Sequence, residues 1–374
     1  MTPAELSRTV LRSVRGAVEE QELSVPVPAR IVVQPPPRPG CGDYASNVAL
    51  QLAQQAGRPA REVAEILRKR LVGSAGIARV EIAGPGFLNF TLGDGAQVAL
   101  VRDVLAQGAA YGERGAGGRG GVPGPSPVRT SAREPVRTSA REPVREPVRV
   151  PSPDGARGLA VAEALGRIRA AAGEGLPDAA GAAGAVGDDA YVVDERAADE
   201  LAVLAARLGA DEARWVLLRP AAHDPVRVPE RPVQRESNPR FRVQYAYARV
   251  RALVRNAAEL GFEGRPGDVG QALGGTAAQA APVAQSLQAL LTLLATYPSE
   301  IEVAARLRAP DRVARHLEAT ADAFFRWHDD FPPLPVGEQK PLAVHRARLA
   351  LAEASGTVLA NGLRLLGISA PEYL

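Results

Sequence analysis

A repeat rich in proline and arginine interrupts this chain about a third of the way along, and it constrains the fold more than any other feature. Residues 127–153 read PVRTSAREPVRTSAREPVREPVRVPSP and follow a glycine-rich stretch that begins at Gly115. Frequent proline, with almost no large apolar side chain other than valine, leaves nothing to form a core. We therefore expect a disordered linker over 113–155, with folded units on either side.

The N-terminal unit, residues 1–112, has the pattern of a small α/β domain. Apolar residues recur at helical spacing near its start, and the later run RVEIAGPGFLNFTL alternates as two strands around a glycine-proline turn do. The predicted elements, in order, are a helix carrying Leu6, Val10, Val14 and Val18, a short strand over Ala29–Gln34, an amphipathic helix over Arg61–Val72, two strands around Gly84–Gly86 and a helix over Val98–Leu105.

The C-terminal part is predicted to be almost entirely helical. One helix over 156–175 and a segment of small residues make up the unit 156–196, and five or more helices are expected over 197–374. Breaks are expected at Pro220–Pro239, Gly261–Gly275, Pro298, Pro310 and Phe331–Pro341. The fold class is therefore α+β: a small N-terminal α/β domain, a linker rich in proline and arginine, and a C-terminal all-α helical bundle.

Composition excludes several classes of site. The net charge is +3, but residues 114–149 alone hold eight Arg and three Glu, so any further basic surface must be local. Cys41 is the single cysteine, which rules out an intrachain disulfide and a cysteine-based metal centre. The sequence has no signal-peptide pattern and no run of 18 apolar residues. We expect a cytoplasmic protein with no membrane, metal or cofactor partner.

Three segments of the N-terminal unit carry the first motif. Residues 41–50 (CGDYASNVAL), 58–64 (RPAREVA) and 80–90 (VEIAGPGFLNF) follow one another in the order that the N-terminal additional domain of arginyl-tRNA synthetases has, and they closely resemble it. The resemblance implies a domain that contacts the elbow of a tRNA around the D-loop. The contact is expected on the strand after the glycine-proline turn.

Two residues of that strand are the candidates for binding the elbow. Phe87 offers a ring on which an unpaired base can stack, and the amide of Asn89 offers a donor and an acceptor to a base edge. The alternative is that Phe87 and Phe90 fill the core of the domain.

Residues 238–250 (NPRFRVQYAYARV) carry the second motif. Asn238 and Pro239 are typical of a helix start. Helical spacing then puts Arg242, Tyr245 and Arg249 on a face separate from the valines, and a tyrosine between two guanidinium groups suits single-stranded RNA. The alternative is a solvated arginine face around a half-buried tyrosine.

This helix resembles the one that opens the anticodon-binding domain of arginyl-tRNA synthetases, a DALR-type domain. Arg242 stands where the family has an aromatic residue, and Tyr247 where it has histidine. Residues 208–215 (LGADEARW) and 358–372 (VLANGLRLLGISAPE) are similar to the same family. The family ends Arg-Met next to the anticodon, so the resemblance adds Tyr373 and Leu374 to the anticodon-binding candidates, without the cation.

The catalytic signatures of that family are missing from the sequence. Adenylate formation needs a His-x-Gly-His motif and, commonly, a Lys-Met-Ser-Lys loop, but none of the four histidines lies in such a motif and Met1 is the single methionine. Residues 155–173 resemble the helix after the first signature, with both signature histidines replaced, although chance similarity competes with this interpretation. We therefore expect no catalytic residues.

Three functions follow from the resemblance. The first is a non-catalytic tRNA-binding paralogue of arginyl-tRNA synthetase, which holds an arginine-type tRNA by elbow and anticodon loop without aminoacylation. The second is a regulatory module that binds a synthetase or another protein and has lost RNA binding. The third is an arginine-tRNA ligase, which the missing signatures disfavour.

Overall fold

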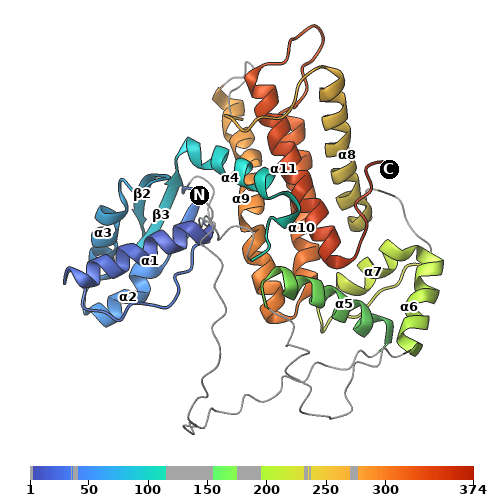
Figure 1. The fold of residues 1–374 in the computed structure, drawn as a ribbon. Helices are drawn as coiled ribbons and strands as arrows, with labels where there is room; N and C mark the ends of the chain where they lie inside the picture. Colours follow the sequence, from blue (N-terminus) through green and yellow to red (C-terminus); the bar gives the residue numbers. More distant parts are fainter. Residues whose placement is uncertain are drawn as a thin grey trace, which may run out of the picture.

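A computed structural model describes residues 3–34, 36, 41–114, 155–174, 195–230, 235, 237–269 and 277–374. Figure 1 shows a small body that contains the sheet beside a larger helical body. The repeat, and with it nearly all of the predicted linker, lies outside the described residues, as does most of the predicted flexible segment before residue 195.

The small body is a three-stranded antiparallel sheet covered by helices. The order of the strands is β1-β3-β2, so β3 is central. Its apolar core includes Leu6, Val10, Tyr44, Leu67 and Phe90, all almost completely buried. The elements are α1 (Pro3–Glu19), β1 (Tyr44–Ser46), α2 (Val48–Ala56), α3 (Ala60–Leu71), β2 (Ile77–Ala83) and β3 (Phe87–Leu92). The predicted helices and the hairpin are confirmed.

The motif residues of this body hold the sheet together. Gly86, in the turn between β2 and β3, has φ 146°, and a Cβ there would come within 3.0 Å of Ala60 at the start of α3. Asp43 Oδ2 accepts a hydrogen bond of 2.6 Å from the Leu92 amide, which joins β1 to the end of β3. The glycine-proline turn and the Gly-Asp pair of the first motif are therefore structural.

The strand expected over Ala29–Gln34 is wrong apart from its last residue. Gln34 forms an isolated bridge with Ala45, while residues 29–33 are irregular. Pro26, Pro28 and Pro35 flank this stretch, and a proline cannot donate to a sheet ladder. Over most of its length the segment therefore has no partner strand.

The helical body is built around α11, most of whose residues are buried. Its elements are α4 (Asp94–Gln107), the 3-10 turn Gly108–Ala110, α5 (Gly155–Ala171), α6 (Glu195–Leu208), α7 (Ala210–Leu218), α8 (Pro239–Glu259), α9 (Ala277–Leu307), α10 (Pro310–Asp330) and α11 (Ala343–Leu366). Leu100, Val101 and Val104 of α4 pack in this helical core rather than in the core of the sheet. The helix α4 therefore belongs to the helical body by its contacts.

The break expected at Pro298 is wrong, because α9 runs through it from Ala277 to Leu307. Proline lacks the N–H that would bond to the carbonyl of Leu294 one turn earlier, and such a gap ordinarily destabilises a helix. Here the hydroxyl of Tyr111 donates to the Leu294 carbonyl at 2.9 Å. A side chain from another part of the chain thus supplies the missing donor, which a local sequence rule cannot foresee.

The two bodies meet at tyrosines. The buried Tyr44 of β1 has its hydroxyl hydrogen-bonded to the side chain of Thr292 on α9, and burial raises the pKa of Tyr44 far above its usual value. Tyr111 stacks on Tyr297 with ring centroids 6.1 Å apart. Asn361 of α11 donates to the carbonyl of Gly108 at 2.9 Å. These contacts tie the sheet and the α4 region to the helical body.

Among the described residues, no helix is both long enough and apolar enough to cross a membrane.

Candidate nucleic-acid interface

The helix α8 begins where the sequence predicts. Asn238 caps it by accepting hydrogen bonds from the amides of Arg240 (3.0 Å) and Phe241 (3.4 Å), and Pro239 takes the first helical position. The Glu212 carboxylate of α7 accepts from Asn238 Nδ2 at 2.8 Å and from Arg240 Nε at 2.5 Å. Both charged side chains are about nine-tenths buried. The start of α8 is therefore fixed to α7 by a buried ion pair.

The helix α8 has one buried face and one exposed face, as its sequence pattern predicts. Val243, Ala246 and Val250 are buried against the helical core. Tyr245 is 37% exposed, and Arg249 is also exposed. The stripe that contains Tyr245 and Arg249 therefore faces solvent and is open to a ligand.

Tyr245 is part of a row of aromatic rings. Its ring is stacked with Phe241, one turn earlier, at a centroid distance of 6.1 Å, and with Phe325 of α10 at 5.5 Å. The planes differ by 4° and 24° respectively. Phe241 and Phe325 are half-buried, so the row presents a continuous partly exposed aromatic surface. Such surfaces accept unpaired bases of any sequence.

Arg242 does not act as a free cation beside this row. Its guanidinium lies 5.3 Å from the centroid of the Phe325 ring and forms an ion pair of 2.5 Å with Asp322 of α10. The sequence predicted a cation in place of an aromatic ring at this position. In the structure the charge of Arg242 is offset by Asp322, and two other residues, Phe241 and Phe325, provide rings beside Tyr245.

Arg249 lies on the same border between α8 and α10, close to His328. Burial, followed by the positive charge of Arg249, lowers the pKa of His328 below its usual value. His328 is therefore neutral at neutral pH, and Arg249 supplies the positive charge at this end of the aromatic row. Among the described residues, no ion pair is formed by Arg249.

The C-terminal residues lie on another side of α8. Arg251 forms an ion pair of 3.0 Å with Glu372, and the guanidinium of Arg255 is 4.2 Å from the ring centroid of Tyr373. Tyr373 is 71% exposed and Leu374 59% exposed. Arg255 follows Tyr245 by ten residues, about 15 Å along the helix and about 80° around it. The structure therefore brings Arg242, Tyr245 and Arg249 together, but not Tyr373 and Leu374 with them.

The two elbow candidates differ in exposure. Phe87 opens β3 directly after the turn and is 40% exposed. Asn89 is only 8% exposed, because it lies on the central strand opposite Ala45 of β1 and Glu81 of β2. Phe90 is completely buried and belongs to the core. Figure 1 shows the sheet and α8 on opposite sides of the helical body.

Among the described residues, no group of three or more histidine, cysteine, aspartate or glutamate side chains is arranged to hold a metal ion. Of the four histidines, His316 is buried on α10, His345 Nδ1 accepts from the Leu342 amide at the start of α11, and His223 is exposed beside Asp224. These side chains lie on different elements.

Two family models match the chain. The arginyl tRNA synthetase N terminal domain matches residues 8–92, which end just before α4. The DALR anticodon binding domain matches residues 243–374, which contain α8 from Val243 onward, α10 and the C-terminal tail. The candidate residues for the anticodon thus fall in or at the edge of the second domain, and those for the elbow in the first.

Similar whole proteins are arginine–tRNA ligases. The protein from Frankia alni is 29% identical over 564 aligned positions that cover all of both chains. That from Pseudarthrobacter chlorophenolicus is 43% identical over 170 residues, which cover 45% of this chain and 30% of the relative. The solved structure of Thermus thermophilus arginyl-tRNA synthetase has a TM-score of 0.52 at 14% identity, with all of both chains covered, which is a likeness of fold.

The length of the chain sets a limit on what it shares with these relatives. The alignment with the Frankia alni protein has 564 positions, whereas this chain has 374 residues, so a large part of the alignment holds no residue of this chain. The chain is therefore built from the N-terminal domain and the DALR anticodon-binding domain of the arginyl-tRNA synthetase family, without room for that family's full catalytic domain.

Proposed function

We propose that this protein binds tRNA without aminoacylating it. The observation that carries the proposal is the row Phe241, Tyr245 and Phe325, partly exposed, flanked by Arg249 and located within or next to the DALR anticodon binding domain. Unpaired bases of an anticodon loop stack on such rings, while guanidinium groups pair with the phosphates between them. The tRNA is expected to be of the arginine type.

The elbow of the same tRNA is proposed to meet the N-terminal domain at Phe87. The exposed ring of this residue offers a stacking surface beside the glycine-proline turn. Asn89 is buried in the sheet, so we assign it a secondary part: it reaches a base edge only through the small exposed fraction of its side chain. Tyr373 and Leu374 would contact the RNA farther along α8, beside Arg255.

The lack of catalysis is proposed from the residues that would be needed and from the roles of those present. Neither signature loop that stabilises the transferring phosphates exists in the sequence. Two of the histidines that are present have structural contacts: His345 accepts from the amide of Leu342 at the start of α11, and His316 packs on Tyr297. We therefore expect no arginine-dependent exchange of pyrophosphate into ATP in a preparation free of host synthetase. Exchange that stays with the purified chain would contradict the proposal.

The binding site is tested by two variants at one position. Tyr245→Ala removes a base-stacking surface worth about 1–3 kcal/mol, so tRNA affinity should fall roughly tenfold to a hundredfold. Tyr245→Phe retains the ring and should bind almost as tightly as the natural chain. Titration of a fluorescent unmodified arginine tRNA measures both variants. Equal affinity of the two, in proteins that fold, would exclude Tyr245 as an RNA contact.

A chain that binds no tRNA at all would instead favour the alternative of a protein-interaction module. The measurement must therefore include the natural chain over a salt series, because electrostatic RNA binding is lost at high salt.

A further inference from the structure

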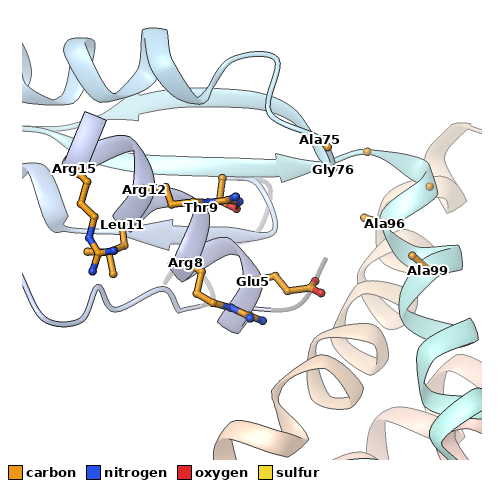
Figure 2. Close-up of a pocket in the computed structure, with 12 residues that line it drawn as sticks. Glu5, Arg8, Thr9, Leu11, Arg12, Arg15, Ala75, Gly76, Ala96 and Ala99 are labelled. Carbon is orange, nitrogen blue, oxygen red and sulfur yellow. Dashed lines mark hydrogen bonds between the residues drawn. The ribbon is translucent and has the colours of Figure 1, made fainter. Parts of the chain in front are cut away.

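A pocket of about 960 Å³ lies where the two bodies meet, between α1 and the start of α4. Figure 2 shows α1 on one side of it and α4 on the other. The wall formed by Gly93 and the first turns of α4 consists of small residues, Gly93, Gly95, Ala96 and Ala99. The wall formed by α1 carries long charged side chains. The pocket lies outside every site considered above.

Three arginines form the wall on α1. Arg8, Arg12 and Arg15 are four and three residues apart, a spacing that puts them on one side of a helix. All three side chains are exposed and line the pocket. Glu5 is the one carboxylate among the residues that line it. The described lining is therefore strongly positive.

Two of these guanidinium groups have no carboxylate partner in the described part of the chain. Arg12 donates to the hydroxyl of Thr9 at 3.3 Å, and Arg15 forms no ion pair there. The neighbouring Arg70 differs, because it holds Glu20 at 2.5 Å and Glu22 at 2.6 Å. Positive charge at the pocket is thus available for a ligand, while that of Arg70 is already offset.

The pocket continues as a groove over α1. A second hollow of about 640 Å³ shares Thr9, Arg12 and Ala75 with the first and reaches Arg70 and Ser74. A groove of this kind follows an extended anionic chain better than a single small anion. It begins near Gly93, six residues along β3 from Phe87, which is about 20 Å in a strand.

We propose that the arginine face of α1, formed by Arg8, Arg12 and Arg15, binds the sugar-phosphate backbone of the tRNA. This inference rests on the proposed function and deepens it, because it assigns the N-terminal domain a second, base-independent contact at the opposite end of the β2–β3 hairpin from Phe87. Guanidinium groups take phosphates in a bidentate manner, and successive arginines along the helix take successive phosphates. Because this wall faces the start of α4, the RNA bound there contacts both bodies of the protein.

The test compares two double variants of the full chain. Arg12→Gln/Arg15→Gln removes the two arginines that have no carboxylate partner among the residues that the structure describes. The control, Arg207→Gln/Arg306→Gln, removes the same charge from exposed positions on α6 and α9, away from the pocket. Binding of an unmodified arginine tRNA is measured for each from low to high salt.

The α1 variant should lower the slope of log affinity against log salt by about 1.4–1.8, since each phosphate contact contributes about 0.7–0.9. At about 0.15 M salt this corresponds to a loss of roughly tenfold to thirtyfold. The control should bind as the natural chain does, and both variants should melt at the natural temperature. The effect should be similar for tRNAs of different sequence.

Each contrary result has a definite meaning. An unchanged slope for Arg12→Gln/Arg15→Gln, with tRNA binding by the natural chain intact, overturns the α1 site and leaves the proposed function standing. An equal loss in the control shows a bulk charge effect and also overturns the site. Competition by poly-glutamate as effective as competition by RNA overturns it in favour of an acidic peptide ligand. No tRNA binding by the natural chain overturns both proposals.

Discussion

Arginines are used differently in the two bodies. On α8, Arg240 is buried against Glu212, Arg242 is paired with Asp322 and Arg251 with Glu372. On α1, Arg12 and Arg15 have no carboxylate partner among the described residues. Three arginines of α8 thus hold neighbouring helices and the C-terminal tail in place, whereas Arg12 and Arg15 of α1 remain available to a ligand. The contacts proposed on α8 and α10 therefore depend mainly on stacking, whereas those proposed on α1 depend on charge.

The largest effect on stability is expected from the buried ion pair between Glu212 and Arg240 in the helical body. Glu212→Ala leaves Arg240 buried without its carboxylate and also removes the acceptor for Asn238, which should cost about 3–5 kcal/mol of unfolding free energy. Urea unfolding measures the loss. The double change Glu212→Gln/Arg240→Gln, which leaves no charge unpaired, serves as the control and should cost less. If Glu212→Ala lowers the unfolding free energy by less than about 1 kcal/mol, the ion pair does not stabilise the fold.

A pH dependence of stability should come from a buried histidine of the helical body. Burial lowers the pKa of His316 from 6.5 to about 4, with Glu300 opposing and Arg312 reinforcing the shift. Between pH 6.5 and about 4 the unfolded chain binds the proton and the folded chain does not, so stability is complete above pH 6.5 and falls as pH decreases through this window, by about 2–3 kcal/mol.

The matched variant is His316→Phe, which cannot bind a proton. Urea unfolding from pH 7 to pH 4.5 should show a smaller fall in this variant than in the natural chain. Parallel curves for the two proteins would contradict the assignment of this pH dependence to His316.

A smaller effect on stability is expected from the hydrogen bond between Tyr111 and the Leu294 carbonyl. Tyr111→Phe leaves the Leu294 carbonyl without its donor and should cost about 1–3 kcal/mol. In a Pro298→Ala background the new amide at residue 298 can donate to that carbonyl, so the same change should cost less. A double-mutant cycle from thermal or urea unfolding measures the difference. Equal costs in both backgrounds would mean that Tyr111 does not compensate for Pro298.

The smallest expected effect is on the stability of the α1 variant. Arg12 and Arg15 are exposed and pair with no carboxylate in the described part of the chain, so Arg12→Gln/Arg15→Gln should change the unfolding free energy by less than about 0.5 kcal/mol. A calorimetric melt measures this. A large loss of stability would mean that these arginines are structural, as those of α8 are, and would erase the contrast between the two bodies.

The sequence predicts local features of this fold well. The cap Asn238 with Pro239, the turn at Gly84–Gly86 and the helical spacing of Val243 and Val250 each depend on a few adjacent residues, and each is confirmed. The exposure of Tyr245 also follows from helical spacing alone.

Features that depend on distant parts of the chain escape such reasoning. Pro298 stays helical because Tyr111 supplies a donor from 187 residues away in the sequence, and Phe325 joins Tyr245 because α10 packs beside α8. Asn89 is buried because β3 is the central strand, and the order of strands cannot be read from alternation. Arg242 of α8 forms an ion pair because Asp322 of the neighbouring helix α10 lies opposite it. Each case is a tertiary contact that overrides a local pattern.

The central claim is that the aromatic row on α8 and α10 binds an anticodon loop. The most direct measurement is the affinity of Tyr245→Ala for an unmodified arginine tRNA, together with its melting temperature. The account predicts a roughly tenfold to hundredfold loss of affinity, with unfolding free energy lowered by only about 1–2 kcal/mol because two ring contacts are removed at a partly exposed position. A folded variant that binds this tRNA as tightly as the natural chain would contradict the claim.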